Sequence, residues 1–257
     1  MSTPILGIIG TGMVGTGIAR RAVDAGLTVV LSNSRGPESL AALVTELDTR
    51  AGAAERAGVA ERVRAATPAE TARVADLVVV AVPLTALDRL PRAELTGKTV
   101  IDPMNYVVYP GSNVPELDRN ELTSSEFAQR HLTGARVVKA FHSIGPKHLL
   151  DLFRPAGAAD RTALPISGDD AAAKREVTEL LDVLGFDAVD LGTLADSWRS
   201  EPNTPLYALP YVGEPPAGLS VPDFVAWVQA APGVPVPAAR VRELAAATVR
   251  GPAGFRM

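Results

Sequence analysis

The stretch Ile5-Leu6-Gly7-Ile8-Ile9-Gly10-Thr11-Gly12-Met13-Val14-Gly15 decides the fold of this chain of 257 residues. It begins with a short apolar run and continues directly into a glycine-rich turn of the form G-x-G-x-x-G. Apolar residues then recur at helical spacing from Val14 to Ala25, and Gly26 is a natural helix stop. A strand, a glycine turn and a helix in this order are typical of a dinucleotide-binding βαβ unit.

Each glycine of the turn has its own physical role. Gly10 permits the tight turn, Gly12 lets a diphosphate approach the backbone, and Gly15 lets the helix pack closely on the strand. The diphosphate is expected at the helix N-terminus, where free N–H groups and the helix dipole attract an anion. The turn therefore predicts a bound dinucleotide rather than a glycine-rich loop without a ligand.

The residues after the second expected strand indicate which dinucleotide binds. An NAD enzyme usually has Asp or Glu there, to accept hydrogen bonds from the ribose 2′-OH. This chain has Ser32-Asn33-Ser34-Arg35 instead, and its next acid is Glu38. A carboxylate would repel a 2′-phosphate, whereas Arg35 can form charge-assisted hydrogen bonds with it. We therefore predict NADP, the alternative being that Arg35 is an ordinary solvated side chain.

The same alternation of strand and helix continues through the first half of the chain. Short β-branched runs predict further strands, and their almost continuous apolar character is expected of strands covered on both faces. The pattern predicts an α/β fold with a Rossmann-type, doubly wound parallel sheet. The expected strands cover residues 5–9, 27–31, 77–82, 99–102 and 136–140.

A further strand–helix–strand unit is expected later in the chain. The helix begins at Asp169-Asp170, carries apolar residues on one face and ends at Gly185. Strand-like runs at 163–167 and 186–191 flank it. This unit either extends the first sheet or belongs to a second lobe.

Two regions are less regular. Residues 104–122 are rich in Pro, Gly, Asn and Tyr, and are expected to form a long loop. The tail after Glu201 holds 10 of the 21 prolines. It is expected to run over the surface, with short helices near 222–229 and 238–249.

Composition excludes several classes of function. The chain has 25 basic and 29 acidic residues, and no run of Lys or Arg suggests a nucleic-acid partner. It has no cysteine, which excludes disulfides and thiolate chemistry, and the spacing of its three histidines does not suggest a metal site. The apolar run at 77–87 is too short to span a membrane. A cytoplasmic enzyme is expected.

His142 is the candidate catalytic residue. It follows the expected strand at 136–140, and ligands of open α/β sheets bind beyond the carboxyl ends of strands. His142 is therefore expected near the nicotinamide end of the cofactor. The alternative is a histidine packed at a strand end, with its nitrogens satisfied by the backbone. His131 and His148 are expected to be surface residues.

Beyond these motifs, the chain resembles the NADPH-dependent reductases of the deazaflavin coenzyme F420. The resemblance covers roughly residues 5–206 and depends on five further segments. These are Ser34-Arg35, Ala81-Val82-Pro83, Ala140-Phe141-His142-Ser143-Ile144, Gly168-Asp169-Asp170, and Asp190 to Pro205, all in addition to the glycine turn.

The resemblance implies an NADP-binding Rossmann domain at 1–145 and a smaller C-terminal lobe at 146–257 that holds the second substrate and carries the proline-rich tail. It implies a homodimer formed through the C-terminal part. His142 and Ile144 would face the deazaflavin. The expected cofactor-binding residues are Gly10, Thr11, Gly12, Met13, Val14, Gly15, Ser32, Asn33, Ser34, Arg35, Ala81, Val82, Pro83 and Ile144.

Three functions remain open at this point. The first is hydride transfer between NADP(H) and coenzyme F420, which needs positioning more than a strong acid or base. The second is reduction of a small carbonyl or imine, which needs a proton donor such as Tyr106, Tyr109 or Lys147. The third is non-catalytic sensing of NADP(H). The loop at 104–122 and the tail after Tyr211 look enlarged, and both could cover the second-substrate pocket.

Overall fold

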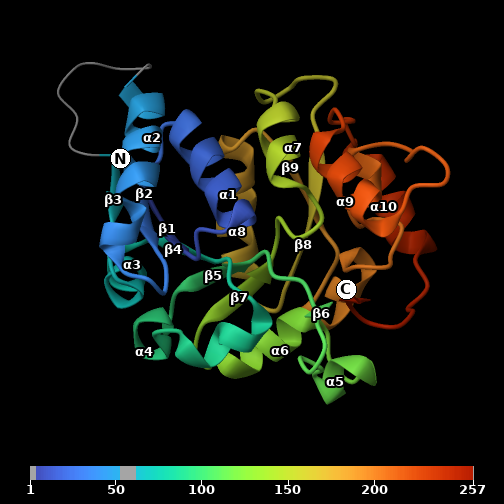
Figure 1. The fold of residues 1–257 in the computed structure, drawn as a ribbon, viewed down its shortest axis with the longest axis horizontal. Helices are drawn as coiled ribbons and strands as arrows, with labels where there is room; N and C mark the ends of the chain where they lie inside the picture. The colour runs from blue at the N-terminus through green and yellow to red at the C-terminus, as the bar shows by residue number, and fades with distance from the viewer. Residues whose placement is uncertain (1–3, 53–61, 257) are drawn as a thin grey trace.

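The computed structural model describes residues 4–52 and 62–256, and its centre is one eight-stranded sheet (Figure 1). The strand order is β3-β2-β1-β4-β5-β7-β8-β9. The chain thus moves outward from β1 to β3 on one side, returns to β4 beside β1, and continues outward on the other. The strands are β1 (Ile5–Ile9), β2 (Thr28–Ser32), β3 (Val63–Ala65), β4 (Leu77–Val80), β5 (Thr99–Asp102), β7 (Arg136–Lys139), β8 (Ala163–Gly168) and β9 (Asp187–Asp190).

The first six strands of this order are parallel, as the sequence predicts, and one later pairing is not. β8 pairs antiparallel with β7, with Val138 opposite Gly168, and β9 then pairs parallel with β8. The unit at 163–191 therefore extends the first sheet. The sheet is mixed at this edge, because the chain crosses from β7 to β8 through α7 and reverses direction.

Helices cover both faces of the sheet, and alternate strand residues enter two separate cores. Val79, Ile101 and Val138 pack with helices α1, α7 and α8, whereas their neighbours Val78 and Val100 pack on the other face. This alternation follows from the period of two in a strand. The helices are α1 (Met13–Asp24), α2 (Ala41–Gly52), α3 (Pro68–Val74), α4 (Arg92–Leu95), α5 (Pro115–Asp118), α6 (Ser124–His131), α7 (Pro146–Asp151), α8 (Ala171–Val183), α9 (Val221–Ala230) and α10 (Ala238–Ala247).

The described residues also form short 3-10 helices, which join several of the main elements. They are η1 (Pro37–Leu40), η2 (Leu84–Arg89), η3 (Leu194–Ser200) and η4 (Leu209–Tyr211). Thr67 caps α3, Thr123 caps α6 and Asp170 caps α8, each by accepting a hydrogen bond from a backbone N–H of the first turn. The cap at Asp170 explains the expected helix start.

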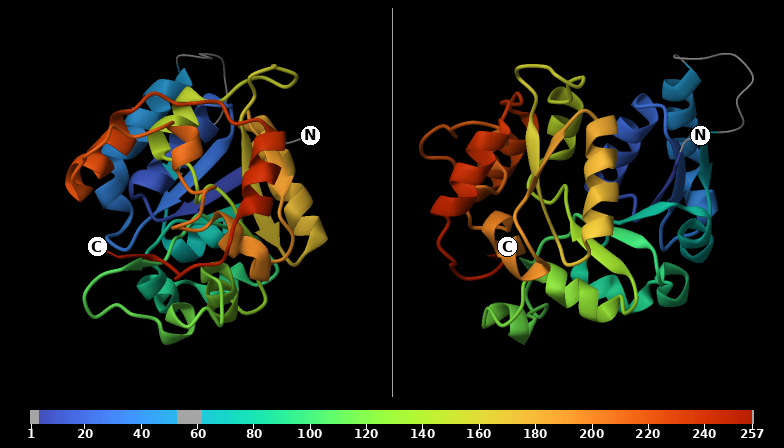
Figure 2. Two further views of the ribbon diagram at one scale, coloured as in Figure 1. Left: turned by 90° about the vertical axis from the view of Figure 1, so that its right-hand side faces the viewer. Right: turned by 180° about the vertical axis from the view of Figure 1, so that it is seen from behind.

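The segment at 104–122 and the tail are more ordered than the sequence suggests. The segment contains β6 (Val107–Val108) and the short helix α5, so the expectation of a loop throughout is wrong. β6 pairs with β10 (Phe255–Arg256) at the end of the tail, and Arg256 forms an ion pair with Asp118 at 3.2 Å. The tail also carries α9 and α10, which lie beside α7 and β8 (Figures 1 and 2). Within the described ranges, no helix is long and apolar enough to cross a membrane.

Candidate functional site

The glycine turn between β1 and α1 has the geometry that its sequence predicts. Gly10 has φ +104°, and a Cβ there would lie 2.2 Å from the Ala81 carbonyl oxygen. A Cβ on Gly15 would lie 1.9 Å from the Gly10 carbonyl oxygen. A Cβ on Gly12, in contrast, would have no protein atom within 4 Å. Two glycines are therefore required by the fold, and Gly12 faces open space.

Two cavities meet at this turn, at the carboxyl ends of the parallel strands, and a third adjoins them. The first, of about 350 Å³, lies beyond β1, β2 and β4, which is where the strand order reverses and where ligands of doubly wound sheets bind. Most of the predicted cofactor-binding residues line it. They are Gly10, Thr11, Gly12, Asn33, Ser34, Arg35, Ala81, Val82 and Pro83.

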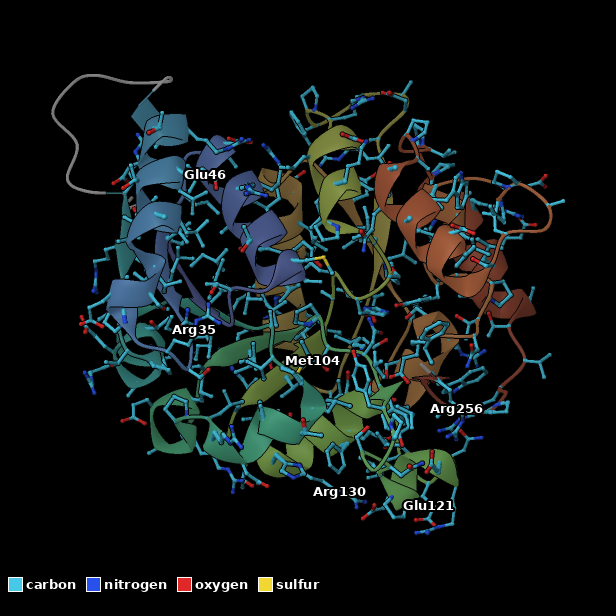
Figure 3. All side chains as sticks on the ribbon, viewed as in Figure 1. Arg35, Glu46, Met104, Glu121, Arg130 and Arg256 are labelled. Atoms are coloured by element: carbon cyan, nitrogen blue, oxygen red, sulfur yellow. The ribbon has the colours of Figure 1, made fainter. Side chains whose placement is uncertain are left out.

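Side chains after β2 organise this first cavity. Asn33 Nδ2 donates to Thr11 Oγ1 at 3.4 Å and to Ser39 Oγ at 3.0 Å, which ties the end of β2 to the glycine turn. Asn33 Oδ1 accepts from the Arg35 backbone N–H at 2.8 Å. The Arg35 side chain, labelled in the left part of Figure 3, is exposed, and it forms no ion pair with any residue in 4–52 or 62–256. Its charge is available to an anion in the cavity.

The second cavity, of about 620 Å³, shares Thr11 and Gly12 with the first. Four further predicted residues line it: Met13, Val14, His142 and Ile144. Its far wall comes from two residues of α9, Val228 and Gln229. A third cavity of about 200 Å³ touches both, because it shares Pro83 with the first and Asn105 with the second.

Two predicted cofactor-binding residues line none of these cavities. Gly15 lies inside α1, and its close packing on Gly10 shapes the turn from behind. Ser32 is completely buried in β2, and its Oγ donates to the Ile8 carbonyl at 3.3 Å. Contact between a cofactor and either residue stays a prediction.

His142 is buried and lies where β7 leads into α7. Its Nε2 lies 2.7 Å from Ser200 Oγ, whereas its Nδ1 is buried without a hydrogen-bond partner. Its carbonyl accepts from Asn105 Nδ2 at 2.9 Å. Burial holds the pKa of His142 well below its ordinary value, and the nearby Lys139 ammonium lowers this pKa further. The hydrogen bond with Ser200 raises the pKa, but by less. The imidazole is therefore neutral at physiological pH.

A buried polar network supports the site from below. Lys139 and Asp102 are completely buried, with Nζ and Oδ2 3.6 Å apart. Lys139 also donates to the Met104 carbonyl and to Ser124 Oγ, and Asp102 Oδ1 accepts from the Met104 N–H at 2.8 Å. Ser124 in turn donates to Glu201 at 2.8 Å. The network fixes Met104, near the middle of the molecule in Figure 3, and thereby the adjoining Asn105.

The structure corrects one expectation and adds residues that the sequence did not indicate. His148 is buried, not a surface residue, and its Nε2 lies 3.0 Å from the Ala231 carbonyl. His131 is partly buried, with its Nδ1 2.9 Å from the Phe127 carbonyl. Arg89 lines the first cavity together with Arg35, and Asn105 lines the other two. The sequence near Arg89 gives no sign of this role, because Arg89 reaches the cavity only through the fold of η2.

Comparison with known proteins agrees with this geometry. A family model described as "NADP oxidoreductase coenzyme F420-dependent" matches residues 5–106. The F420-dependent NADP reductase of Methanothermobacter marburgensis is 32% identical over 216 residues, which cover 80% of this chain and 90% of that protein. The chain belongs to this reductase family.

Further family members and a solved structure extend the likeness. The F420-dependent NADP reductase of Methanothermobacter thermautotrophicus is 31% identical over 206 residues, covering 77% of this chain and 84% of that protein. The crystal structure of a hypothetical protein from Sinorhizobium meliloti is 33% identical, with a TM-score of 0.65, covering 81% of this chain and 94% of that one. The family likeness thus extends well beyond the glycine turn.

Proposed function

We propose that this member of the reductase family transfers a hydride between NADP(H) and a deazaflavin coenzyme of the F420 type. The observation that carries the proposal is the pair of cavities that share Thr11 and Gly12. One cavity is bordered by an arginine after β2 that has no ion-pair partner among the described residues, and the other is bordered by apolar side chains and a neutral histidine. Because the cavities join at the glycine turn, a dinucleotide whose diphosphate lies at the turn could extend its nicotinamide toward His142 and a ring held in the second cavity.

The residues of the first cavity fit NADP. Gly12 leaves room for a diphosphate at the N-terminus of α1, because nothing in the protein occupies the position of a Cβ. Arg35 and Arg89 are both exposed and line the cavity, and the described part of the chain gives neither an ion-pair partner. Two unpaired cations suit a ligand that carries a ribose 2′-phosphate in addition to its diphosphate.

The residues of the second cavity fit a flat, largely apolar ring. Val14, Ile144 and Pro146 give it aliphatic walls. Its polar lining includes the neutral His142 and the amide of Asn105, and the cationic side chains of Arg20 and Lys147 also border it. Asn105 Oδ1 is buried without a partner, so it is available to accept a hydrogen bond from a ring N–H. The two cofactors supply the redox chemistry when bound, and this chain supplies orientation and exclusion of water.

Two of the three candidate proton donors for reduction of a carbonyl or imine are bound to partners within the protein, and the third, Tyr109, is exposed and lines the third cavity. Tyr106 donates its hydroxyl to Asp118 at 3.0 Å and accepts from the Val114 N–H, and burial raises its pKa. Lys147 forms an ion pair with Asp151. These contacts of Tyr106 and Lys147 favour hydride transfer to a deazaflavin over the carbonyl or imine reaction.

The test mixes NADPH, the oxidised deazaflavin and the protein, and follows loss of the deazaflavin absorbance. We expect reduction that depends on both protein and NADPH, with much weaker activity from NADH. Bound NADPH without any reduction of the deazaflavin would contradict the proposal. In that outcome, a screen of carbonyl and imine acceptors against NADPH oxidation separates the other reductase function from sensing.

The division at 145/146 and a homodimer through the C-terminal part belong to the same proposal. The sheet continues from β7 to β8 across the division, so the two parts would be lobes built on one sheet. Several exposed large apolar side chains lie in the C-terminal part, which supports an interface there. They are Phe153, Val183, Leu209, Val234 and Val249. Light scattering at several protein concentrations tests the dimer.

A further inference from the structure

The tail of this chain reaches the second cavity through α9. Val228 and Gln229 line that cavity together with Gly12, His142 and Ile144, although Val228 comes 86 positions after His142 in the chain. α9 also lies outside the stretch at 5–106 that the family model matches. The cavity wall formed by α9 therefore comes from outside the segment that the family model matches.

The C-terminal end of α9 is held firmly against the site. The His148 ring donates from Nε2 to the Ala231 carbonyl, since a carbonyl can only accept. Directly after this point, the Val234 N–H donates to the Tyr211 carbonyl at 2.9 Å, and Gly233 packs so closely on Leu152 that a Cβ there would lie 2.6 Å from Leu152 Cγ. These contacts set the position of the last turn of α9, which carries Val228 and Gln229.

The same contacts link α9 to the glycine turn through α7. Pro146 at the start of α7 lies against α1, because a Cβ on Gly17 would lie 2.8 Å from Pro146 Cβ. His148 then joins the same helix to the end of α9. The distance across the second cavity is thus fixed by three packed helices, with α7 in the middle. The packing of these helices therefore determines the width of the second cavity.

We propose that α9 is a specificity-determining wall of the acceptor site, and that Val228 sets how large a ring system the site admits. This inference depends on the proposed function, since it assigns the second cavity to the deazaflavin. Val228 supplies an apolar surface for the ring, and the neighbouring Gln229 offers an amide donor and acceptor to a polar edge. The acceptor preference of this chain is then set by its tail as well as by His142 and Ile144.

The test compares Val228→Trp with Ala226→Trp. Ala226 is on the same helix, is exposed and does not line the cavity, so it controls for the effect of a large side chain on α9. Binding of the oxidised deazaflavin, without NADPH, is measured by fluorescence anisotropy. We expect Val228→Trp to weaken it about tenfold or more, because the indole fills space that the ring needs, and to raise its KM in the same proportion. NADPH affinity should stay within about twofold for both variants, and Ala226→Trp should match the wild type.

Equal deazaflavin affinity in the two tryptophan variants would overturn the inference and leave the proposed function intact. A wild-type protein that binds the deazaflavin without reducing it would overturn the proposed function alone. Absence of deazaflavin binding would overturn both. If Val228→Trp does not fold, as judged by its circular dichroism, Val228→Ala replaces it. This smaller residue should increase the rate with acceptors bulkier than the deazaflavin, and unchanged acceptor preference would count against the inference.

Discussion

Replacing Arg35 with alanine tests the assignment of the NADP cavity most directly. The side chain is exposed and pairs with no carboxylate in the described ranges, and the hydrogen bond from its backbone N–H to Asn33 Oδ1 survives the substitution. The variant should therefore fold normally, with Tm within about 2 °C of the wild type. Any change in cofactor binding can then be attributed to the lost guanidinium group.

The size of the effect follows from the charge and exposure of the group. A hydrogen bond to a charged partner contributes about 1.5–3 kcal/mol, which corresponds to a loss of roughly tenfold to a hundredfold in NADPH affinity. Arg35 is exposed, so solvent and salt screen the interaction, and the lower end is expected at physiological ionic strength. NADH has no 2′-phosphate, and its affinity should be nearly unchanged. Arg35→Lys should lie between the two, because lysine keeps the charge and loses the planar fork.

Calorimetric titration of both cofactors into each protein measures these differences. Arg89→Ala should also weaken NADPH more than NADH, since Arg89 lines the same cavity. Arg92→Ala is the matched control, because Arg92 is a nearby exposed arginine that pairs with Asp88 and does not line the cavity. Equal loss of NADPH and NADH affinity in Arg35→Ala would refute the assignment of the 2′-phosphate to this side chain.

Three further perturbations separate the roles of turn, histidine and network. Gly12→Val should abolish binding of both NADPH and NADH, because the side chain fills space that the diphosphate needs. The protein should stay folded, because a Cβ at this position meets no protein atom, and calorimetry and circular dichroism check the two points. His142→Gln should remove a loss of stability that the wild type shows at acid pH. Burial and Lys139 lower the pKa of His142 in the folded state, so the unfolded chain binds the proton at a higher pH than the folded chain does. The free energy of unfolding of the wild type should therefore fall by up to about 1.4 kcal/mol per pH unit below pH of about 6.5. Denaturant titrations of both proteins across this pH range measure the difference, and an equal pH dependence of stability in both would contradict the lowered pKa of His142. Lys139→Met should cost about 3–5 kcal/mol in urea unfolding, because Asp102 is left buried without its counter-charge; recovery in Lys139→Met/Asp102→Leu tests that cause.

Local sequence signals were sufficient for the NADP-binding half. Strand, turn and helix are short-range structures, and the glycines at positions 10 and 15 are required by contacts that lie within the βαβ unit or on the adjoining strand. The residues of Ser34-Arg35 follow β2 directly, so their place at the sheet edge is fixed by the parallel order of strands. A strand as short as β3 gave no comparable signal, because three residues are too few to show a period.

The acceptor side could be only partly predicted. His142 and Ile144 follow the end of a predicted strand and line the second cavity, and their contact with the cofactors stays a prediction. The burial of His148, the reach of Arg89 and the pairing of Lys139 with Asp102 were not visible, since each depends on elements far apart in the chain. The sequence likewise did not decide the antiparallel pairing of β8 with β7, because both strands are buried apolar runs.

The sequence by itself therefore determined the Rossmann unit and its glycine turn, and it predicted a contact of Arg35 with a 2′-phosphate, because these depend on residues adjacent in the chain or at the ends of adjacent strands. Only the tertiary structure decided what encloses the acceptor site. α9 reaches the cavity through His148 and Ala231, and β10 pairs with β6 at the far end of the segment at 104–122. Such contacts join residues that are many positions apart, and packing and hydrogen bonding in the folded chain, not local periodicity, select them.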